Sequence, residues 1–414
     1  MATLPYRPRI VDAVISERLQ DFPAISLLGP RASGKTTTAS RHARAILRLD
    51  DPGEAAVVQA NPDAALRDRP EPLLIDEWQE APAVLGAVKR AVDADPRAGR
   101  FLLTGSVTAD LQSSVWPATG RVIHVPLTTL SVRERIADAA AAPVIERIVR
   151  SGAAELNVPE APLDLRDYLG LALTGGFPEP ALRLPARARR TWLDSYVQQL
   201  VTRDALAVDA SRDPVRIRRF FDVLALNTAG VVDNKTLYDA AHINRATAEA
   251  YERLLHNLFI AEAVPAWFAN RLKRLVKMPK RYLVDAGLAA AAINVDEAMA
   301  LRDHDLLGRL LDTFVAAQLR AELPACPSRP RMHHLRTEGG RQEIDLILEV
   351  AGDRVVGIAI KAAAAVGERE ARHLAWLRDS LGERFLHGLV LHTGPGLFEL
   401  GERITAAPIS VLWS

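Results

Sequence analysis

Apolar and polar positions alternate in a regular way over the first third of the chain. Short apolar runs occupy residues 24–29, 46–50, 73–76, 101–105 and 121–127, with amphipathic or loop segments between them. Buried runs that alternate with helices predict a parallel sheet covered by helices on both faces. Each run ends in a polar residue or a glycine. We expect those residues at the carboxyl edge of the sheet, where open α/β folds bind ligands.

The pattern changes after residue 135. Residues 136–165 form an alanine- and proline-rich stretch that we interpret as a connector. Residues 166–300 carry apolar positions at spacings of three and four, which predicts helices. Residues 301–414 begin with a helical pattern and continue with a strand pair, a helix and further apolar strands. The chain is therefore expected to hold an N-terminal α/β domain, a helical middle domain and a C-terminal α/β domain.

Composition narrows the class of protein. The chain has 414 residues, of which 49% are hydrophobic and 25% charged, as in soluble globular proteins of two or three domains. Its net charge of +1 provides no general attraction to nucleic acid or anionic membranes, so such binding needs a local patch. The single cysteine, Cys326, excludes an internal disulfide, and we expect it in the core. No signal peptide or membrane-length apolar run is evident, which favours a cytoplasmic protein without membrane contact.

The stretch "GPRASGKT" at residues 29–36 fits the phosphate-loop pattern G-x-x-x-x-G-K-[ST] between a strand and a helix. Gly29 and Gly34 let the backbone curl so that its N–H groups face phosphates, at the positive end of the next helix. Lys35 would reach the β- and γ-phosphates of ATP, and the Thr36 hydroxyl would bind Mg²⁺. The predicted ATP-binding residues are Gly29, Pro30, Arg31, Ala32, Ser33, Gly34, Lys35, Thr36 and Thr37.

Two acidic residues follow the apolar run of "PLLIDEWQ". Asp76 can hold Mg²⁺ through its water shell, and Glu77 can orient and deprotonate an attacking water molecule. Such a pair often serves only as a helix cap. A phosphate loop about forty residues upstream favours the catalytic interpretation.

The run "RFLLTGS" ends in Thr104 and Ser106, either of which could place a hydroxyl between water and the γ-phosphate. A polar turn would look the same. Arg121, in the following "ATGRVIHVPL", is a candidate γ-phosphate sensor, or a finger for a neighbouring copy in a homo-oligomer, and equally a surface arginine. Phosphate loop, "LLIDE" and "LLTGS" together look like the AAA+ arrangement, in which an extra strand lies between the phosphate-loop strand and the Mg²⁺ strand.

Residues 233–285 show the order helix, turn, helix and β-hairpin with basic residues in or beside the hairpin. This order predicts a winged helix-turn-helix, whose second helix commonly enters a DNA groove while basic residues neutralise phosphates. Packing between domains or contact with a protein remains an alternative. The candidate DNA-binding residues are Asn244, Arg245, Arg271, Lys273, Arg274, Lys277, Lys280 and Arg281.

The C-terminal strand pair has the spacing of a metal-dependent nuclease core of PD-(D/E)xK type, with Asp345 on one strand and Lys361 on its partner. Such a core needs an acid two residues before the lysine, so that two carboxylates share the metal. That position is Ala359. Asp312 on the preceding helix is a candidate third acid, and Glu343 or Glu349 could replace the missing one. The simpler interpretation is a nuclease-like fold that has lost cleavage, with Asp312, Asp345 and Lys361 as its remnants.

Several stretches stand out in order along the chain: "LLGPRASGKTT", "LLIDEWQ", "LLTGS", "ATGRVIHVPL", "LTGGFPEP", "YVQQLVTRD", "KMPKRYLVDAGL" and "EIDLILE". Together they resemble a prokaryotic family of AAA-type ATPases with a C-terminal DUF4143 domain. The resemblance spans nearly the full length. It implies an ATPase core at 1–135, a winged-helix domain at 166–300 and a restriction-endonuclease-like α/β domain at 301–414. Members of the family usually have Glu-Val-Lys where this chain has Ala359-Ile360-Lys361, which further disfavours cleavage.

Three functions follow as hypotheses. The first is an ATPase that uses ATP and Mg²⁺ and acts on DNA, mostly without sequence preference, through the winged helix and the nuclease-like tail. The second is a switch in which ATP or ADP occupancy alters contacts with a protein partner. The third is an active metal-dependent DNA nuclease.

Overall fold

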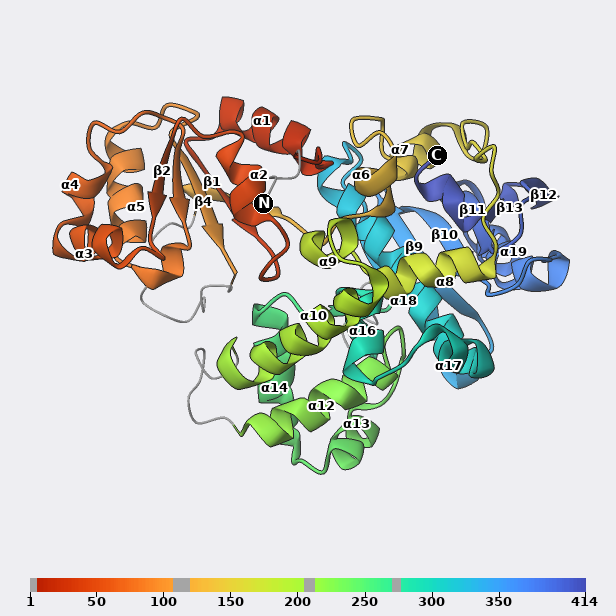
Figure 1. Ribbon diagram of the computed structural model, residues 1–414. Helices are drawn as coiled ribbons and strands as arrows, with labels where there is room; N and C mark the ends of the chain where they lie inside the picture. The colour runs from red at the N-terminus through yellow and green to blue at the C-terminus, as the bar shows by residue number, and fades with distance from the viewer. Residues whose placement is uncertain (1–5, 107–119, 205–212, 270–276) are drawn as a thin grey trace. The chain divides into compact units, whose positions relative to one another are not determined.

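The computed structural model describes residues 6–106, 120–204, 213–269 and 277–414. Contacts divide the chain into two compact units. The first holds residues 1–129 with 256–260, and the second holds 130–255 with 261–414. The first unit is built around one sheet, and the second holds a larger sheet and a two-stranded pair (Figure 1).

The first unit contains a parallel sheet of five strands in the order β2-β3-β4-β1-β5. The strands are β1 (Ala24–Leu28), β2 (Ala45–Arg48), β3 (Leu73–Asp76), β4 (Phe101–Gly105) and β5 (Val122–Pro126). All five apolar runs therefore form strands, as predicted. Strand β4 lies between β1 and β3, which confirms the expected extra strand between the phosphate-loop strand and the strand that ends in Asp76.

Helices cover both faces of this sheet (Figure 1). One face carries α3 (Pro52–Ala60), α4 (Pro62–Leu66) and α5 (Val84–Ala94), and the other carries α1 (Val11–Asp21) and α2 (Lys35–Ser40). The apolar side of α5 packs on β3 and β4 through Leu85, Val88 and Val92, which are buried in one cluster with Leu73 and Phe101. Burial of apolar side chains on both faces explains why the strands read as continuous apolar runs.

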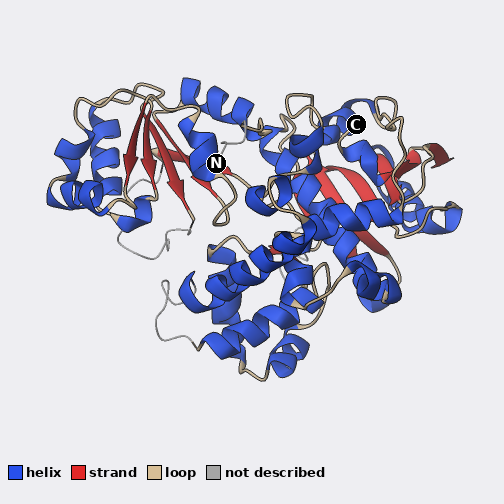
Figure 2. Ribbon diagram, in the orientation of Figure 1, coloured by secondary structure: helices blue, strands red, loops and turns tan. Residues whose placement is uncertain are grey.

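The second unit begins with helices almost throughout, as Figure 2 shows. These are α6 (Val132–Ile136), α7 (Val144–Ser151), α8 (Leu165–Thr174), α9 (Pro178–Leu182), α10 (Ala186–Gln199), α12 (Pro214–Leu226), α13 (Asn234–Ala241) and α14 (Arg245–Asn257). Strands β6 (Ala261–Val264) and β7 (Lys280–Leu283) then form an antiparallel pair. Helix α7 lies inside the segment that the sequence suggested as a connector, so this segment is partly helical.

Three further helices, α16 (Ala286–Ala292), α17 (Glu297–Arg302) and α18 (His304–Glu322), lead to a mixed sheet of six strands in the order β12-β13-β11-β10-β9-β8. Its strands are β8 (Arg331–Arg336), β9 (Glu343–Val350), β10 (Arg354–Ile360), β11 (Phe385–His392), β12 (Phe398–Gly401) and β13 (Ile404–Pro408). Strands β8, β9 and β10 are antiparallel neighbours, and β11 lies parallel to β10 after helix α19 (Glu368–Leu381). The C-terminal block is thus a mixed α/β domain, as predicted.

Helix α19 covers the sheet through Leu374 and Leu377, which are buried against Phe385 and Val355. A Cβ atom at Gly357 of β10 would lie 2.6 Å from the Leu374 side chain, so the helix rests on a strand without a side chain at this point. Cys326 is buried, as expected. Within the described ranges, no helix combines the length and apolar character needed to cross a bilayer.

Candidate nucleotide site

The phosphate loop runs from the end of β1 to the start of α2. Gly29 follows β1 directly, and a Cβ atom there would lie 1.9 Å from the carbonyl oxygen of Leu127, so only glycine fits. Gly34 has φ of 95°, a left-handed conformation that glycine adopts without strain. Helix α2 begins at Lys35, so its N-terminal N–H groups face the loop. The other residues predicted to line the nucleotide are the loop residues Pro30, Arg31, Ala32 and Ser33, and Thr37 on α2.

Lys35 lies inside this loop, and 4% of its surface is exposed. Its Nζ donates hydrogen bonds to the carbonyl oxygens of Gly29, at 3.0 Å, and Pro30, at 2.8 Å. Burial lowers the pKa of Lys35 to about 8, although the charges of Glu77 and Asp76 act in the opposite direction. The ammonium is thus held in the loop by two carbonyl groups that a triphosphate can replace with charged oxygens.

Asp76, at the end of β3, lies between two hydroxyl groups. Thr36 Oγ1 donates to Asp76 Oδ1 over 2.8 Å, and Thr104 Oγ1 donates to the same oxygen over 2.5 Å. Thr104 is the second-to-last residue of β4, so the contact joins two neighbouring strands at the carboxyl edge of the sheet. Hydroxyl and carboxylate oxygens are the ligands that Mg²⁺ accepts, and this ion usually keeps several waters and few protein ligands. Thr36 and Asp76 therefore suit Mg²⁺.

Glu77 follows in a left-handed conformation, with φ and ψ both 52°. Few residues other than glycine adopt this geometry, and it turns the chain sharply at the strand end. The Glu77 backbone N–H donates to Thr104 Oγ1 over 3.3 Å, and Ser106 Oγ donates to Glu77 Oε2 over 3.4 Å. The structure thus brings together five residues singled out in the sequence: Thr36, Asp76, Glu77, Thr104 and Ser106.

Gln79 is a site residue that the sequence did not reveal. Its side-chain amide donates to Glu77 Oε2 and lies 3.5 Å from Ser106 Oγ. A glutamine two residues after the acidic pair carries no signal of its own, because its side chain reaches the site only through the turn at Glu77.

Arg121 lies far from these groups along the strands. It precedes β5, whose first residue pairs with Ala24 at the start of the parallel strand β1. This is the amino edge of the sheet, opposite to the phosphate loop. Its guanidinium forms an ion pair with Asp93 at 2.9 Å, and 42% of its side chain is exposed. A γ-phosphate sensor role within its own chain is therefore wrong on geometry. The role of a finger for a neighbouring copy stays a prediction.

The candidate DNA-binding residues separate into three groups. Asn244 caps α14 by accepting a 2.9 Å hydrogen bond from the Thr247 N–H, Arg245 is an exposed partner of Glu249, and Lys277 is exposed. Three candidates lie outside the described residues: Arg271, Lys273 and Arg274. The remaining two, Lys280 and Arg281, are buried.

The burial of Lys280 and Arg281 corrects their assignment as DNA contacts. Lys280 is 3% exposed and Arg281 is 8% exposed. Arg281 forms an ion pair with Glu252 of α14 at 2.6 Å. Both positive charges are neutralised inside the protein, so neither can meet a phosphate backbone.

Lys280 instead lies between the two acids proposed as nuclease remnants. Its Nζ forms an ion pair with Asp312 Oδ2 of α18 and lies 3.4 Å from Asp345 Oδ1 of β9. The other two carboxylate oxygens also have donors: Asp312 Oδ1 accepts from the Tyr282 hydroxyl at 2.8 Å, and Asp345 Oδ2 from the Ile360 N–H at 2.8 Å. All four carboxylate oxygens are thus hydrogen-bonded within the protein. In the described part of the chain, no group of three or more His, Cys, Asp or Glu side chains could hold a metal ion.

Lys361 follows β10 directly. Burial by itself raises the pKa of Asp345, but the charges of Lys280 and then Lys361 act against it, and the pKa is lowered overall. The structure therefore brings Asp312, Asp345 and Lys361 into one region, as the nuclease-like pattern predicts, and adds Lys280 and Tyr282 from β7. In the sequence, only the motif "KMPKRYLVD" singled out Lys280 and Tyr282. Its basic residues suggested an exposed, DNA-binding surface and not a buried site.

Family models match three parts of the chain. Residues 21–136 match an AAA domain, residues 165–298 match a domain of unknown function, DUF8612, and residues 307–412 match another, DUF4143. Two curated relatives, the uncharacterized proteins Rv2008c of Mycobacterium tuberculosis and Mb2031c of Mycobacterium bovis, are each 26% identical over 402 residues. These matches cover 96% of this chain and 82% of each relative.

Among solved structures, the Walker-type ATPase PABY2304 of Pyrococcus abyssi is 15% identical with a TM-score of 0.41, over 68% of this chain and 94% of that one. AMPPCP-bound DnaA from Aquifex aeolicus is 14% identical with a TM-score of 0.28, over 62% of this chain and 89% of that one. The fold and the matched family models agree with the resemblance drawn from the motifs. The chain carries an AAA domain followed by a C-terminal DUF4143 domain.

Proposed function

We propose that the chain is a Mg²⁺-dependent ATPase whose site lies at the carboxyl edge of the five-stranded sheet. The observation that carries this proposal is the hydrogen-bonded set Thr36, Asp76 and Thr104, next to an ammonium group held inside the phosphate loop. Lys35 and the loop N–H groups bind the triphosphate. Mg²⁺ held by Thr36 and Asp76 would supply positive charge at the β- and γ-phosphates.

Glu77 acts as the general base. It accepts the proton of a water molecule as the water oxygen attacks the γ-phosphorus, and the bond to the bridging oxygen breaks to release ADP and phosphate. Ser106 and Gln79 orient the Glu77 carboxylate, and Thr104 holds the Glu77 backbone at the end of β3.

The test is ATP turnover in Glu77→Gln. We expect the variant to bind ATP as the parent does and to lose about 10²- to 10⁴-fold in kcat, the usual contribution of a general base. Glu80→Gln, an exposed acid three residues on, is the matched control and should turn over normally. Parent-level hydrolysis by Glu77→Gln would show that another group is the base.

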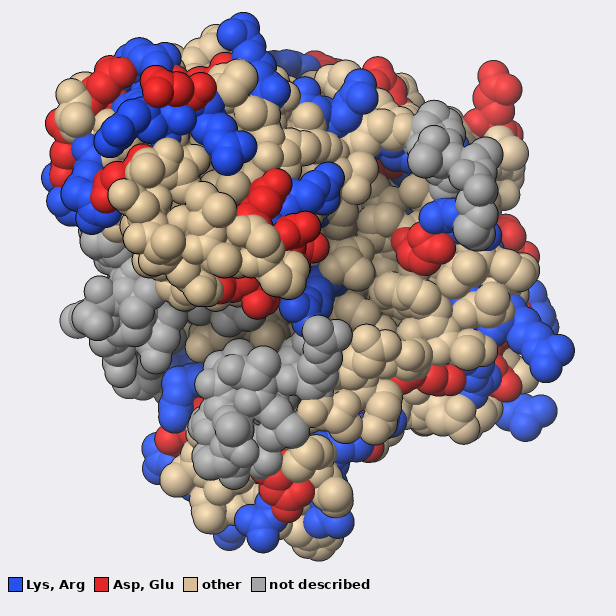
Figure 3. Space-filling model, turned by 60° about the vertical axis from the view of Figure 1, so that its left-hand side comes forward, with Lys and Arg blue, Asp and Glu red and all other residues tan. Residues whose placement is uncertain are grey.

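DNA is the second part of the proposal. Helices α12, α13 and α14 with the β6–β7 pair, and the bridge between Gly230 and Arg281, have the order of a winged helix. A cavity of about 480 Å³ beside it is lined by Val231, Asp233, His334 and two exposed cations, Lys277 and Arg336. These two cations suit a phosphodiester, for which Arg336 would have to leave its 3.8 Å ion pair with Glu343. Positive and negative side chains are interspersed on the face drawn in Figure 3, so contact would be local.

DNA-stimulated ATP hydrolysis tests this part. We expect single-stranded, duplex or branched DNA to raise kcat at 50 mM salt, and the effect to weaken at 200 mM because phosphate contacts are lost. Lys277→Glu should reduce the stimulation, while Lys89→Glu on α5 should not. No stimulation by any DNA would favour the alternative, a switch in which ATP or ADP occupancy changes contacts with a protein partner.

The C-terminal domain is inferred to be nuclease-like and unable to cleave. Ala359 replaces the acid that a second metal ligand requires, and Lys280 supplies positive charge where a metal would lie between Asp312 and Asp345. We therefore expect no nicking of plasmid DNA by the full chain with Mg²⁺ or Mn²⁺. Nicking that disappears in Asp345→Ala would instead establish an active nuclease. The domain organisation proposed with this function remains 1–135, 136–165, 166–300 and 301–414.

A further inference from the structure

Arg9 connects the phosphate loop to the segment that leaves the ATPase sheet. It lies just before α1 and is 5% exposed. Its Nη1 donates to the carbonyl oxygen of Ser33 over 3.0 Å, and its Nη2 donates to the carbonyl oxygen of Thr128 over 2.8 Å. Ser33 belongs to the phosphate loop, whereas Thr128 lies two residues after β5. A buried guanidinium is costly unless its N–H groups are bonded, and these two carbonyl groups offset part of that cost.

The same two segments also touch through the backbone. The Leu127 N–H donates to the carbonyl oxygen of Leu28 over 2.8 Å. The Leu127 carbonyl is the group that a side chain at Gly29 would strike. Leu127 therefore lies directly against the first residue of the phosphate loop, and Thr128 follows it in the chain.

On the other side of Thr129, the chain is anchored within the C-terminal unit. The Leu130 N–H donates to the carbonyl oxygen of Gly176 over 2.7 Å, and the Val132 N–H donates to Gln318 Oε1 of α18 over 2.7 Å. Arg133 forms an ion pair with Glu322, also of α18, at 2.8 Å, and each side chain is 3% exposed.

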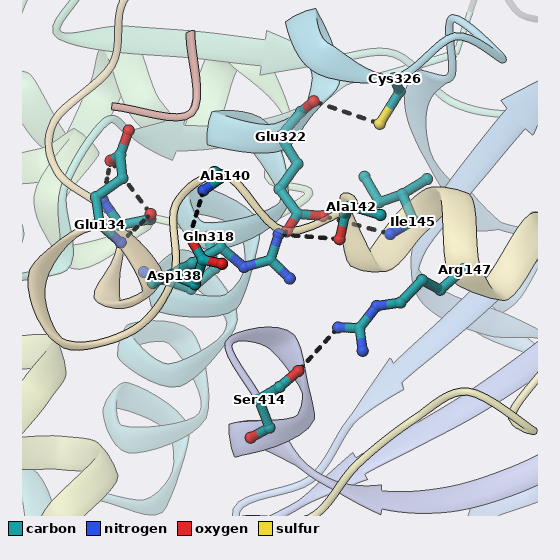
Figure 4. Close-up of polar contacts among 12 residues, drawn as sticks. Glu134, Asp138, Ala140, Ala142, Ile145, Arg147, Gln318, Glu322, Cys326 and Ser414 are labelled. Atoms are coloured by element: carbon teal, nitrogen blue, oxygen red, sulfur yellow. Dashed lines mark hydrogen bonds and ion pairs between the residues drawn. The ribbon is translucent and has the colours of Figure 1, made fainter. Parts of the chain in front are cut away.

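Figure 4 shows the contacts by which Glu322 joins α18 to the segment after Thr129. Its carboxylate points toward the α6–α7 segment, where the Ile145 N–H donates to Oε2 over 3.3 Å. The Arg133 guanidinium donates in turn to the Ala142 carbonyl over 3.3 Å. Helices α6 and α7 are thus fastened to α18, the helix that also carries Asp312.

We propose that Arg9 is a positioning residue that couples nucleotide occupancy of the phosphate loop to the C-terminal unit. Bound triphosphate draws the loop N–H groups toward its oxygens and so reorients the Ser33 carbonyl. Arg9 passes this change to Thr128. Because hydrogen bonding begins again at Leu130, a displacement of Thr128 reaches α6 and α18 along the chain. The inference rests on the proposed function in one respect, that the loop binds ATP.

Hydrogen–deuterium exchange of the full chain tests the coupling. With Glu77→Gln to prevent turnover, a non-hydrolysed ATP analogue should change exchange at the phosphate loop and also at residues 130–136 of the C-terminal unit. Arg9→Ala in the same background should keep analogue binding within about threefold and lose the change at 130–136. Arg9→Lys keeps the charge but has a single donor nitrogen in place of the two that reach Ser33 and Thr128, so it should restore the change only in part. Arg7→Ala, an exposed arginine two residues earlier, is the matched control.

The outcomes are distinct. Analogue binding that changes the loop but leaves 130–136 unchanged in the Arg9-containing protein overturns the coupling and leaves the ATPase intact. A response at 130–136 that survives in folded Arg9→Ala overturns the role of Arg9. No binding of nucleotide by the folded chain means that the proposed function itself fails and the coupling with it.

Discussion

Thr36 and Asp76 are forty residues apart in the chain, and their side chains meet at 2.8 Å. The contact exists because β1 and β3 are parallel and flank β4, so residues that follow each strand come to the same edge of the sheet. Thr104 of β4 completes the set from the strand between them. This arrangement gives the first prediction.

Thr104→Val should destabilise the protein and slow ATP turnover. It removes a buried donor to the Asp76 carboxylate, a kind of hydrogen bond that contributes about 1.5–3 kcal/mol. Urea unfolding measures the loss, and Thr104→Ser, which keeps the hydroxyl, should recover most of it. Thr191→Val, at an exposed site on α10, should change the free energy of unfolding by less than about 0.5 kcal/mol. Equal stability of Thr104→Val and the parent would mean that Thr36 alone satisfies Asp76.

ATP binding should take up a proton above pH 8. Burial lowers the pKa of Lys35 to about 8 in the nucleotide-free protein, so part of the population is neutral at pH 8.5. A triphosphate favours the charged ammonium and raises this pKa again, so affinity falls as the pH rises above 8. Calorimetry in two buffers of different ionisation enthalpy measures the uptake. At pH 7 Lys35 is mostly charged, and the uptake from this group should be small. A constant affinity from pH 7 to 9 would contradict the prediction.

Lys280→Met should be strongly destabilising, by about 3–5 kcal/mol, because it leaves buried carboxylates without their counter-charge. Burial by itself lowers the pKa of Lys280, but the charge of Asp312 leads the effects that together raise it well above its ordinary value. Chemical unfolding measures the loss. Lys277→Met, at an exposed site, is the control.

The double variant Lys280→Met/Asp312→Asn should be more stable than Lys280→Met alone, since it removes one of the unpaired charges. If the two changes were simply additive, Lys280 and Asp312 would not interact as the structure has them.

Glu322 should make stability depend on pH between about 4.5 and 7. Burial raises its pKa from 4.5 to about 7, although the charge of Arg133 acts against the rise. The folded protein therefore keeps a proton on Glu322 that the unfolded chain releases, and the free energy of unfolding falls as the pH rises through this range. The fall amounts to at most about 3 kcal/mol from this group.

Unfolding of Glu322→Gln in urea from pH 4.5 to 8 checks this dependence. The amide cannot ionise, so the variant should lack this contribution to the slope. Glu368→Gln, at an exposed position, should keep the slope of the parent. A slope that persists unchanged in Glu322→Gln would assign the pH dependence to other groups.

The sequence predicted most of the first unit correctly. The five apolar runs became the five strands, because a strand buried on both faces shows its burial in its own residues. The edge that carries Thr36, Asp76 and Thr104 followed from the parallel order of those strands. Gln79 and Arg9 were missed, since each acts through a side-chain contact that the local pattern does not indicate.

The basic residues of the middle domain show the opposite case. From the sequence, Lys280 and Arg281 were indistinguishable from Lys277, because all belong to one positively charged stretch. Tertiary structure buries the first two and leaves the third exposed. A lysine is rarely buried without partners for its charge. The partners of Lys280, Asp312 and Asp345, lie 32 and 65 residues further along the chain.

The sequence by itself determined the phosphate loop, the strands that present it and the acid that ends β3, because these depend on residues adjacent in the chain. Only the tertiary structure decided where the charges of the second unit go. It placed the Lys280 ammonium between two carboxylates, and it fastened the segment after Thr129 to α18 through Arg133 and Glu322. Both results depend on the balance between desolvation and pairing, which exists only once distant segments have packed together.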